Sequence, residues 1–237
     1  MNYTADEMMA VEASRRLADG VVCFVGIGLP SLAANLARRT HAPRCVLIYE
    51  SGPIGAKPDR LPLSIGDGEL AETADTVVSV PEMFAYWLQG ERIDVGFLGA
   101  AQIDRHGGLN STVIGQYERP TVRLPGGGGA PEIALGARDV FVLLRHSPRS
   151  FVERLEFTTS LGDRVRVVVT DFGVLEPRNG ELTLVSTHPG TTADEVVAAT
   201  GWPLSVADDL AVTQPPNNHE LSVLRALTTT QTNGRMT

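Results

Sequence analysis

Three mostly apolar stretches of the chain run for several residues without alternating between apolar and polar side chains. They cover residues 21–25, 45–49 and 93–101. A strand with one face in water alternates, whereas a strand buried on both faces does not. Strands of the second kind belong to parallel or mixed sheets that helices cover. The sequence therefore predicts an α/β fold with an open, mostly parallel sheet covered by helices.

The segments around these stretches supply the helices and the remaining strands. Residues 5–19 place apolar side chains at helical spacing and end at Gly20. Ser31 is the expected N-cap of a second helix, because a serine hydroxyl can accept from the free N–H groups of a first turn. Further helices are expected at 81–88, 192–201 and 220–227, and further strands at 76–80, 139–144, 164–171 and 181–186.

The length of 237 residues fits either one large α/β domain or two small ones. No internal repeat is visible, and we treat residues 1–237 as a single domain. The chain is polar from Pro203 onward and ends in TTTQTNGRMT. We expect this tail to be frayed from about residue 228.

Charge and hydropathy exclude two classes of partner. The net charge of −8 argues against nucleic acid, because affinity for a phosphate backbone comes from clustered lysine and arginine. The N-terminus lacks a basic segment followed by an apolar one, and no run approaches the roughly 20 apolar residues that span a bilayer. We therefore expect no membrane association and a cytoplasmic protein. Cys23 and Cys45 lie in apolar runs without CxxC spacing, which indicates buried hydrophobes rather than metal ligands or redox centres.

A first glycine turn, Gly26-Ile27-Gly28-Leu29-Pro30-Ser31, follows the first apolar stretch. It begins like a dinucleotide fingerprint, but serine occupies the third glycine position and Pro30 stands where the helix should start. Two readings remain open. The glycines either make a tight turn from strand to helix, or they let an anionic ligand approach the start of the helix.

A second glycine turn, 126–129, consists of four consecutive glycines close to apolar elements. Glycine loses much backbone entropy on folding, so such a run is costly unless unusual dihedrals or a close backbone approach require it. Its N–H groups could point into a site as an oxyanion hole or an anion nest. The alternative is a flexible linker.

Glu50 follows the second apolar stretch, in CVLIYESGPIG. Ligands of parallel α/β sheets bind beyond the carboxyl ends of the strands, and a glutamate is rarely buried without a partner. Glu50 could therefore be a nucleophile, a general base or a metal ligand, or else a solvated loop charge or helix cap. A metal site has little support, because Glu69, Glu72 and Asp75 have no histidine at ligand spacing. A GxSxG elbow is absent, which argues against a serine hydrolase.

Taken in order along the chain, these motifs resemble the β subunit of family I CoA-transferases, most closely the glutaconate and 3-oxoadipate branch. Glu50-Ser51-Gly52 resembles the family's catalytic ESG motif, and 26–30 its GIGxP turn. IDVGFLGAA at 93–101, with Gln102 after it, is similar to another family strand, and 126–130 to its glycine-rich stretch. The likeness covers roughly residues 5–200 and implies the CoA-transferase (NagB/RpiA-like) fold.

The resemblance also implies a mechanism without a bound cofactor or metal, with a coenzyme A thioester as substrate. Glu50 would attack an acyl-CoA and then carry CoA as a glutamyl thioester. The backbone of Gly127, Gly128 and Gly129 would hold the oxyanion. Five residues would bind substrate or CoA: Gly26, Gly28, Ser51, Gly52 and Gln102. An α subunit would complete the site, in an α2β2 heterotetramer.

The substrate is less well defined than the chemistry. Relatives in this branch handle glutaconate-like dicarboxylates and 3-oxoadipate, an intermediate of aromatic degradation. A dicarboxylate needs a cation for its distal carboxylate, and Arg60, Arg105 and Arg119 are candidates. Two rival functions stay open: a CoA-thioester hydrolase in which Glu50 activates water, and a non-catalytic binding module of the same fold.

Overall fold

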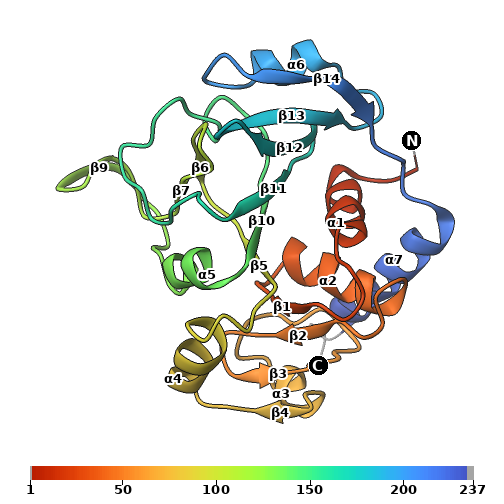
Figure 1. Ribbon diagram of the computed structural model, residues 1–237. Helices are drawn as coiled ribbons and strands as arrows, with labels where there is room; N and C mark the ends of the chain where they lie inside the picture. The colour runs from red at the N-terminus through yellow and green to blue at the C-terminus, as the bar shows by residue number, and fades with distance from the viewer. Residues whose placement is uncertain (1, 234–237) are drawn as a thin grey trace. The chain divides into compact units, whose positions relative to one another are not determined.

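The structure is a computed structural model that describes residues 2–233 (Figure 1). The described chain divides into two compact units. Unit 1 is formed by residues 2–97, 136–138 and 216–233, and unit 2 by Leu98–Leu135 and Asp139–Pro215. The last helix continues to Asn233, past the point where fraying was predicted, and residues 234–237 lie outside the described part.

Unit 1 contains a sheet with the strand order β5-β1-β2-β3-β4. Its strands are β1 (Val22–Phe24), β2 (Val46–Ile48), β3 (Pro53–Ile54), β4 (Thr76–Val77) and β5 (Val95–Leu98). The strands β5, β1 and β2 are parallel, and β3 and β4 continue the sheet antiparallel. The parallel strands are those predicted from the non-alternating stretches, which places their carboxyl ends at one edge.

Cys23 lies in β1 and Cys45 directly before β2, and both are free and buried, as the sequence indicated. Burial raises the pKa of the Cys23 thiol well above its ordinary value, and it raises that of Cys45 to about 12. Both thiols therefore stay protonated and act as small core side chains.

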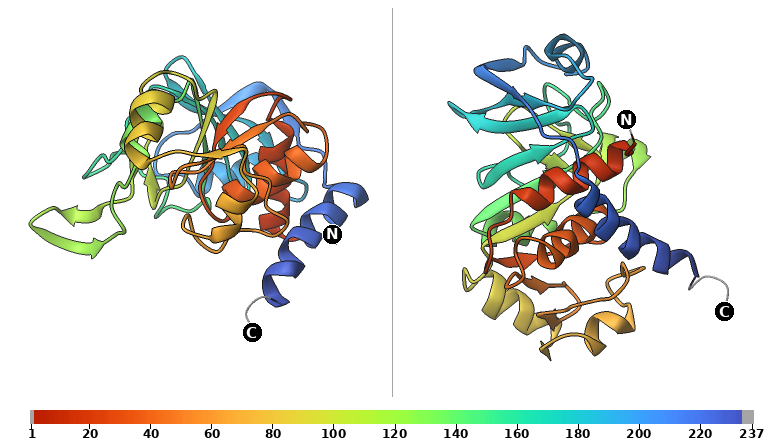
Figure 2. Two further views of the ribbon diagram at one scale, coloured as in Figure 1. Left: turned by 90° about the horizontal axis from the view of Figure 1, so that it is seen from below. Right: turned by 90° about the vertical axis from the view of Figure 1, so that its right-hand side faces the viewer.

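Three helices of unit 1 pack against one another: α1 (Ala5–Arg15), α2 (Leu29–Arg39) and α7 (Asn218–Asn233), seen together in Figure 2. Their shared core contains Val11, Leu36 and Leu224. Arg15 pairs with Glu220 at 2.7 Å and so links α1 to α7. The short helix α3 (Gly68–Glu72) lies between β3 and β4 in the chain. The helix α4 (Val80–Glu82) comes after β4 and continues as the π-helical turn η1 (Met83–Leu88).

The predicted N-cap of α2 was wrong. The helix begins at Leu29 with Gly28 as its N-cap, three residues before Ser31. Pro30 causes this shift, because proline is favoured in the first turn of a helix. The N–H groups of that turn have no acceptor within the helix, so the missing N–H of a proline costs no hydrogen bond. Ser31 is instead completely buried, with its hydroxyl inside the unit.

Unit 2 contains the strand order β14-β13-β12-β11-β10. These strands are β10 (Asp139–Leu143), β11 (Val165–Val169), β12 (Gly173–Arg178), β13 (Glu181–Thr187) and β14 (Ser205–Val212). The strands β10 and β11 are parallel, β12 turns back, and α6 (Ala193–Ala198) precedes β14, which runs parallel to β13. The sequence missed β12 and β14.

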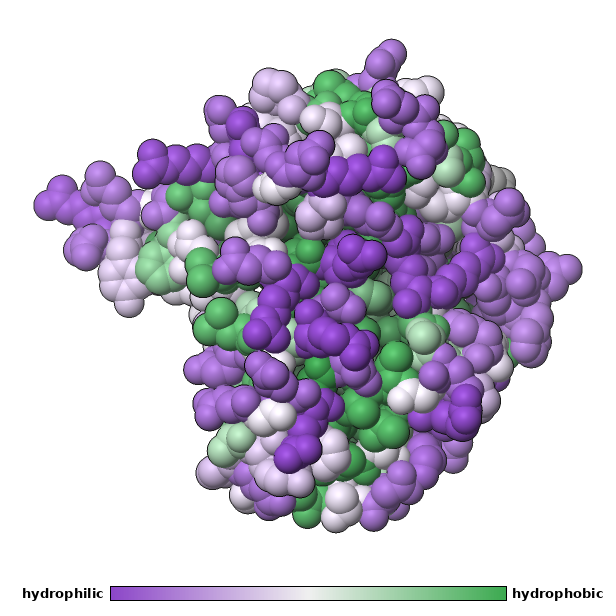
Figure 3. Space-filling model, in the orientation of Figure 1, coloured by the Kyte–Doolittle hydropathy of each residue, from purple (hydrophilic) through white to green (hydrophobic). Residues whose placement is uncertain are grey.

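Two small hairpins and one helix complete unit 2. The first hairpin joins β6 (Gln102–Ile103) to β7 (Leu109–Asn110), and the second joins β8 (Val113–Gln116) to β9 (Arg119–Arg123). The β8–β9 hairpin projects from the unit in Figures 1 and 2, and its end is covered by hydrophilic side chains in Figure 3. The glycine turn leads into α5 (Ala130–Gly136). Within residues 2–233, no helix combines the length and the apolarity that crossing a membrane requires.

Candidate active site

Glu50 lies in the tight turn that connects β2 to β3. The N–H of Gly52 donates to the carbonyl of Tyr49 at 2.9 Å, and the N–H of Tyr49 donates to the carbonyl of Pro53 at 3.0 Å. Glu50 and Ser51 are therefore the two central residues of a closed turn at the carboxyl end of β2. Glu50 is half-buried. The turn explains how a carboxylate can follow a buried strand and still reach a ligand.

Gly52 is required by this turn for two separate reasons. Its φ of 118° lies in a region that side-chain-bearing residues rarely adopt. A Cβ atom there would also lie 2.1 Å from the carbonyl oxygen of Val78, which is backbone and cannot turn away. The N–H of Val78 donates back to the carbonyl of Gly52 at 3.1 Å, so the residue directly after β4 holds the turn closely.

A buried polar network fixes the residue directly before Glu50. The Tyr49 side chain is fully buried, and its hydroxyl lies 3.0 Å from the Ser31 hydroxyl and 3.3 Å from the Asn35 side-chain nitrogen. Burial raises the pKa of Tyr49, and the hydrogen bonds with Ser31 and Asn35 oppose this in part. The other Asn35 side-chain atom, Oδ1, is buried without a partner in the described chain. The network ties the Glu50 turn to α2.

Sequence reasoning missed this network, although a signal was present. Ser31 and Asn35 are four residues apart, which places both on one face of a helix, and their neighbours in α2 are largely apolar. Two polar residues on a buried helix face need a shared partner. The tyrosine at the end of the following strand is that partner.

The first glycine turn follows β1, the strand beside β2. Gly28 has a φ of 83° and no atom within 4 Å of the position of its missing Cβ, so the backbone dihedral alone requires glycine there. Phe24 and Ile48 are register partners, and the N–H of Val25 donates to the carbonyl of Ile48 at 2.8 Å. Gly26, Gly28 and the Glu50-Ser51-Gly52 turn thus follow the carboxyl ends of adjacent parallel strands.

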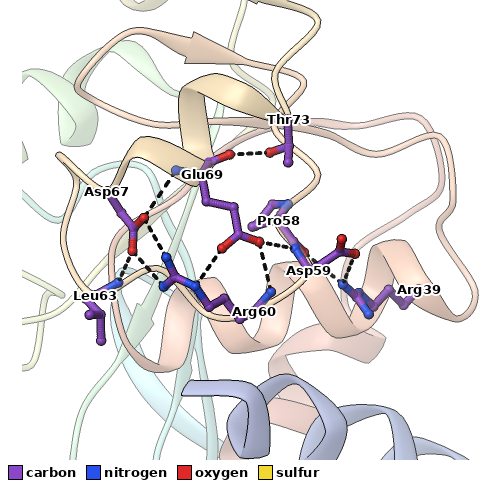
Figure 4. Close-up of polar contacts among 8 residues, drawn as sticks. All are labelled: Arg39, Pro58, Asp59, Arg60, Leu63, Asp67, Glu69 and Thr73. Atoms are coloured by element: carbon purple, nitrogen blue, oxygen red, sulfur yellow. Dashed lines mark hydrogen bonds and ion pairs between the residues drawn. The ribbon is translucent and has the colours of Figure 1, made fainter. Parts of the chain in front are cut away.

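Side-chain contacts hold the loop between β3 and α3 and bind it to the Glu50 turn. The Ser51 hydroxyl donates to the carbonyl of Ile65. Arg60 makes two hydrogen bonds to Asp67, at 2.9 and 3.0 Å, and an ion pair with Glu69 at 2.8 Å (Figure 4). The Arg60 guanidinium holds the pKa of Asp67 below its ordinary value. All three guanidinium nitrogens of Arg60 are thereby engaged in holding the loop.

The second glycine turn lies in unit 2 and offers free donors. Gly126 is anchored, because its N–H donates to the carbonyl of Ser111 at 2.8 Å and its own carbonyl accepts from the Ser111 hydroxyl at 3.0 Å. None of the N–H groups of Gly127, Gly128 and Gly129 donates to another described residue. Gly128 is exposed and has a φ of 52°. Free N–H groups on an anchored turn are what an oxyanion hole needs.

Gln102 also lies in unit 2, and both ends of its amide are engaged. Its oxygen accepts from Asn110 at 2.9 Å, and its nitrogen donates to the carbonyl of Arg149 at 3.4 Å. The half-buried Gln102 therefore joins the β6–β7 hairpin to the turn that carries Arg149. The structure places Gly26, Gly28, Glu50, Ser51 and Gly52 in unit 1, and Gln102, Gly127, Gly128 and Gly129 in unit 2.

The other two arginines considered for a distal carboxylate differ from each other. Arg105 forms ion pairs with Glu153 at 3.2 Å and with Glu181 at 3.4 Å. Arg119 is exposed on the projecting β8–β9 hairpin. Among residues 2–233, no group of three or more histidine, cysteine, aspartate or glutamate side chains is placed to hold a metal ion.

Comparison with known proteins identifies close relatives. A family model described as coenzyme A transferase matches residues 6–199. The B subunit of the 3-oxoadipate CoA-transferase of Pseudomonas knackmussii is 56% identical, over 95% of this chain and 93% of that protein. The B subunit of the glutaconate CoA-transferase of Acidaminococcus fermentans is 32% identical, over 90% of this chain and 88% of that protein.

A solved structure extends the comparison to the fold. The crystal structure of glutaconate coenzyme A-transferase from Acidaminococcus fermentans matches with a TM-score of 0.90 and 29% identity, covering 97% of this chain and 96% of that one. This match confirms the predicted α/β fold. A more distant relative is the cholesterol ring-cleaving hydrolase IpdB subunit of Rhodococcus jostii, 28% identical over 83% of this chain and 80% of that protein.

Proposed function

Since the chain belongs to the coenzyme A transferase family, we propose that it is the B subunit of an enzyme that moves CoA from an acyl-CoA to 3-oxoadipate. The family and the enzyme class predicted from the sequence are confirmed. The 56% identity to a 3-oxoadipate CoA-transferase chain favours 3-oxoadipate over glutaconate, whose named transferase is 32% identical.

Glu50 is the proposed nucleophile. Its carboxylate attacks the thioester carbonyl of the donor, which gives a mixed anhydride and CoA thiolate. The thiolate then attacks the glutamyl carbonyl, which releases the donor acid and leaves CoA on Glu50 as a thioester. The acceptor carboxylate attacks this thioester, and the freed thiolate finally attacks the acyl carbonyl of the second anhydride. The products are acceptor acyl-CoA and the original Glu50 carboxylate.

The observation that carries this proposal is the closed turn at the end of β2. The hydrogen bonds of Tyr49 fix the backbone on both sides of Glu50, and the buried Tyr49 hydroxyl network prevents rotation of the strand end. A nucleophile held in this way loses little freedom when it attacks. The free N–H groups of Gly127, Gly128 and Gly129 support the second requirement, which is stabilisation of the oxyanion in each transfer.

The proposal includes a partner and excludes a resident cofactor. The two transferase relatives named above are B subunits, so an α subunit is required for the complete enzyme. We propose an α2β2 heterotetramer, in which this chain binds its α partner and a CoA thioester enters as substrate. The roles of Gly26, Gly28, Ser51, Gly52 and Gln102 in binding substrate or CoA belong to the same proposal. The absence of a metal and the cytoplasmic location stay predictions.

One experiment tests the nucleophile directly. The complex of this chain with its α subunit is incubated with succinyl-CoA, trapped with borohydride or hydroxylamine, and digested for mass spectrometry. We expect the modification at Glu50. The control is Glu72→Gln, which removes an exposed carboxylate on α3 and leaves labelling unchanged. Labelling at a cysteine or a serine would overturn the mechanism.

The rival function is hydrolysis of a CoA thioester, with Glu50 activating water. The similarity to the Rhodococcus jostii chain, which is named a cholesterol ring-cleaving hydrolase, keeps hydrolysis as a second candidate, although ring cleavage breaks a different bond from a thioester. The two functions differ in their need for an acceptor. Release of free CoA at the same rate with and without 3-oxoadipate would favour the hydrolase, whereas transfer requires the acid.

A further inference from the structure

The Glu50 carboxylate makes no hydrogen bond or ion pair with any residue that the structure describes. No side chain of residues 2–233 therefore fixes this carboxylate directly, and its position depends on the turn that carries it. An attacking group that is displaced by about 1 Å can lose a factor of roughly a hundred in rate. The contacts that hold the turn therefore bear on the reaction, even where they lie away from the carboxylate.

One side chain of the turn is bound to a loop outside the sheet. The Ser51 hydroxyl donates to the carbonyl of Ile65, which is 14 residues further along the chain. Residues 63–66 are all exposed, so burial does not hold this part of the loop in place. The loop can fix Ser51 only if other contacts fix the loop.

Two carboxylates bind the backbone on both sides of residues 61–66, which we call the 61–66 loop. Glu69 accepts from the N–H of Asp59 at 2.5 Å and from the N–H of Arg60 at 3.2 Å. Asp67 accepts from the N–H of Leu63 at 3.0 Å. Both acidic residues belong to the start of α3, where Asp67 is the N-cap. The 61–66 loop is therefore closed against the first turn of that helix.

Arg60 joins these two carboxylates. Its two terminal nitrogens donate to Asp67 and its Nε pairs with Glu69 at 2.8 Å, as Figure 4 shows. The carboxylate side chains are only 8% and 16% exposed. Removal of the guanidinium would leave two poorly solvated negative charges side by side, which is a large cost for a charge pair of low exposure. The two carboxylates would then repel each other, and the 61–66 loop would loosen.

We propose that Arg60 is a positioning residue for Glu50, which acts through the 61–66 loop and the Ser51 hydroxyl. The inference rests on the proposed transferase function, because it concerns the nucleophile of that reaction. Every residue in this series of contacts belongs to unit 1. Arg60 accordingly affects how fast Glu50 attacks a thioester and leaves the affinity for the acyl-CoA unchanged.

The test measures the formation of the Glu50 thioester in a single turnover. The complex with the α subunit is mixed with saturating succinyl-CoA and no acceptor, quenched at intervals, and the Glu50 peptide is quantified by mass spectrometry. The rate reports the attack, and the final amplitude reports the fraction of correctly folded sites. We expect Arg60→Gln to lower the rate by roughly tenfold, with an unchanged half-saturating concentration of succinyl-CoA.

A double-mutant cycle tests the route of the effect. Ser51→Ala removes the hydroxyl that contacts the loop, and we expect a similar loss of about tenfold in rate. If Arg60 acts through Ser51, the double variant is no more than about threefold slower than the slower single variant. Independent effects would multiply to about a hundredfold. If Arg60→Gln does not fold, Arg60→Lys takes its place in the cycle, because lysine keeps the charge but lacks the planar fork.

Arg39→Gln is the matched control. Arg39 donates to the carbonyl of Pro58 at 2.8 Å and pairs with Asp59 at 3.3 Å, so it contacts the segment just before the 61–66 loop. Its printed partners include neither Asp67 nor Glu69. We expect this variant to keep the wild-type rate of thioester formation.

The outcomes separate this inference from the proposed function. If the wild-type complex forms no thioester at Glu50, the proposed function fails and the inference fails with it. If the wild type forms the thioester but Arg60→Gln lowers only the amplitude, Arg60 has a structural role alone and the inference is wrong. Rate losses that multiply in the double variant, or an equal loss in Arg39→Gln, also overturn it. In each of these last cases the transferase function stands.

Discussion

The candidate site residues of the two units differ in how many hydrogen bonds and ion pairs they make with the rest of the protein. In unit 1 the residues around Glu50 are tied down: Tyr49 bonds to α2, Ser51 bonds to a loop, and Arg60 holds that loop through two carboxylates. In unit 2 the N–H groups of Gly127, Gly128 and Gly129 have no partner in the described chain. Unit 1 fixes the backbone around the proposed nucleophile, whereas unit 2 contains N–H donors that have no partner in the described chain.

The largest effect is expected at Glu50, the proposed nucleophile. Glu50→Gln keeps the size of the side chain but cannot form an anhydride or a thioester, so we expect kcat to fall by at least about 10³-fold. Thermal unfolding should be nearly unchanged, because Glu50 is only half-buried in a turn whose closure depends on backbone hydrogen bonds. A variant that retained most of its transferase activity would contradict the covalent mechanism.

A pair of glycine substitutions tests the difference between the units directly. Gly52→Ala in unit 1 places a methyl group against the backbone of Val78 at an unfavourable φ, and we expect a loss on the order of 3 kcal/mol in the free energy of unfolding. Gly128→Ala in unit 2 meets an unfavourable φ but open space, and about 1 kcal/mol is expected.

Urea unfolding of the two variants measures this difference. Gly20→Ala is a suitable reference, since Gly20 also has a positive φ and open space but lies in the turn before β1, at the opposite end of that strand from the candidate residues. The helix α1 already ends at Arg15, before the Gly20 at which the sequence predicted its end. We expect it to match Gly128→Ala in stability and to leave catalysis unchanged. Equal losses for Gly52→Ala and Gly128→Ala would show that the first turn is no more tightly held than the second.

A third prediction concerns His146, which lies shortly after β10 in unit 2. His146 is buried, lies 3.6 Å from Phe151 between ring centroids and also stacks on Phe172. Burial lowers the pKa of His146 to about 4, and the nearby Asp171 opposes this in part. Between pH 6.5 and 4 the unfolded chain binds a proton that the folded chain does not. Stability from this group is therefore complete above pH 6.5 and is lost as the pH falls, by up to about 3 kcal/mol.

The comparison of wild type with His146→Asn isolates this contribution. We expect the free energy of unfolding of the wild type to fall more steeply between pH 6.5 and 4 than that of the variant. His219→Asn, at an exposed position in α7, serves as the control and should keep the wild-type slope. Identical slopes in wild type and His146→Asn would mean that the imidazole is hydrated and that the segment after β10 is looser than its contacts indicate.

The sequence predicted the elements that position Glu50 because they depend on local signals. A non-alternating apolar run marks β2, and a glycine two residues after the glutamate marks the turn. The strand β14 was missed because its residues are mostly exposed and it lies at a sheet edge, so its burial pattern gives no periodic signal. The start of α2 was misplaced because two signals disagreed. The preference of serine for the N-cap favoured a start after Ser31, whereas the preference of proline for the first turn favoured the observed start at Leu29.

The candidate cation could not be selected from the sequence, for a different reason. An arginine is available to a ligand only if no carboxylate engages it, and the engaging carboxylates are distant in sequence. Glu181, for example, is 76 residues from Arg105. Pairings of this kind depend on the tertiary fold, so Arg60, Arg105 and Arg119 looked equivalent in the sequence.

The smallest expected effect concerns the hydrogen bonds of the Tyr49 hydroxyl. It tests whether this network next to Glu50 contributes to catalysis or only to folding. Tyr49→Phe removes one hydroxyl and leaves Ser31 and Asn35 buried with a lost partner, at a cost of about 1–2 kcal/mol in unfolding free energy. If the network positions the proposed nucleophile, kcat falls severalfold while KM for the acyl-CoA stays constant, since the Tyr49 side chain is fully buried. Tyr117→Phe on the projecting hairpin is the matched control and should change neither quantity, because Tyr117 is exposed. A loss of stability with unchanged kcat would show that β2 and β3 alone fix the turn, and the contrast between the two units would then lie in folding and not in catalysis.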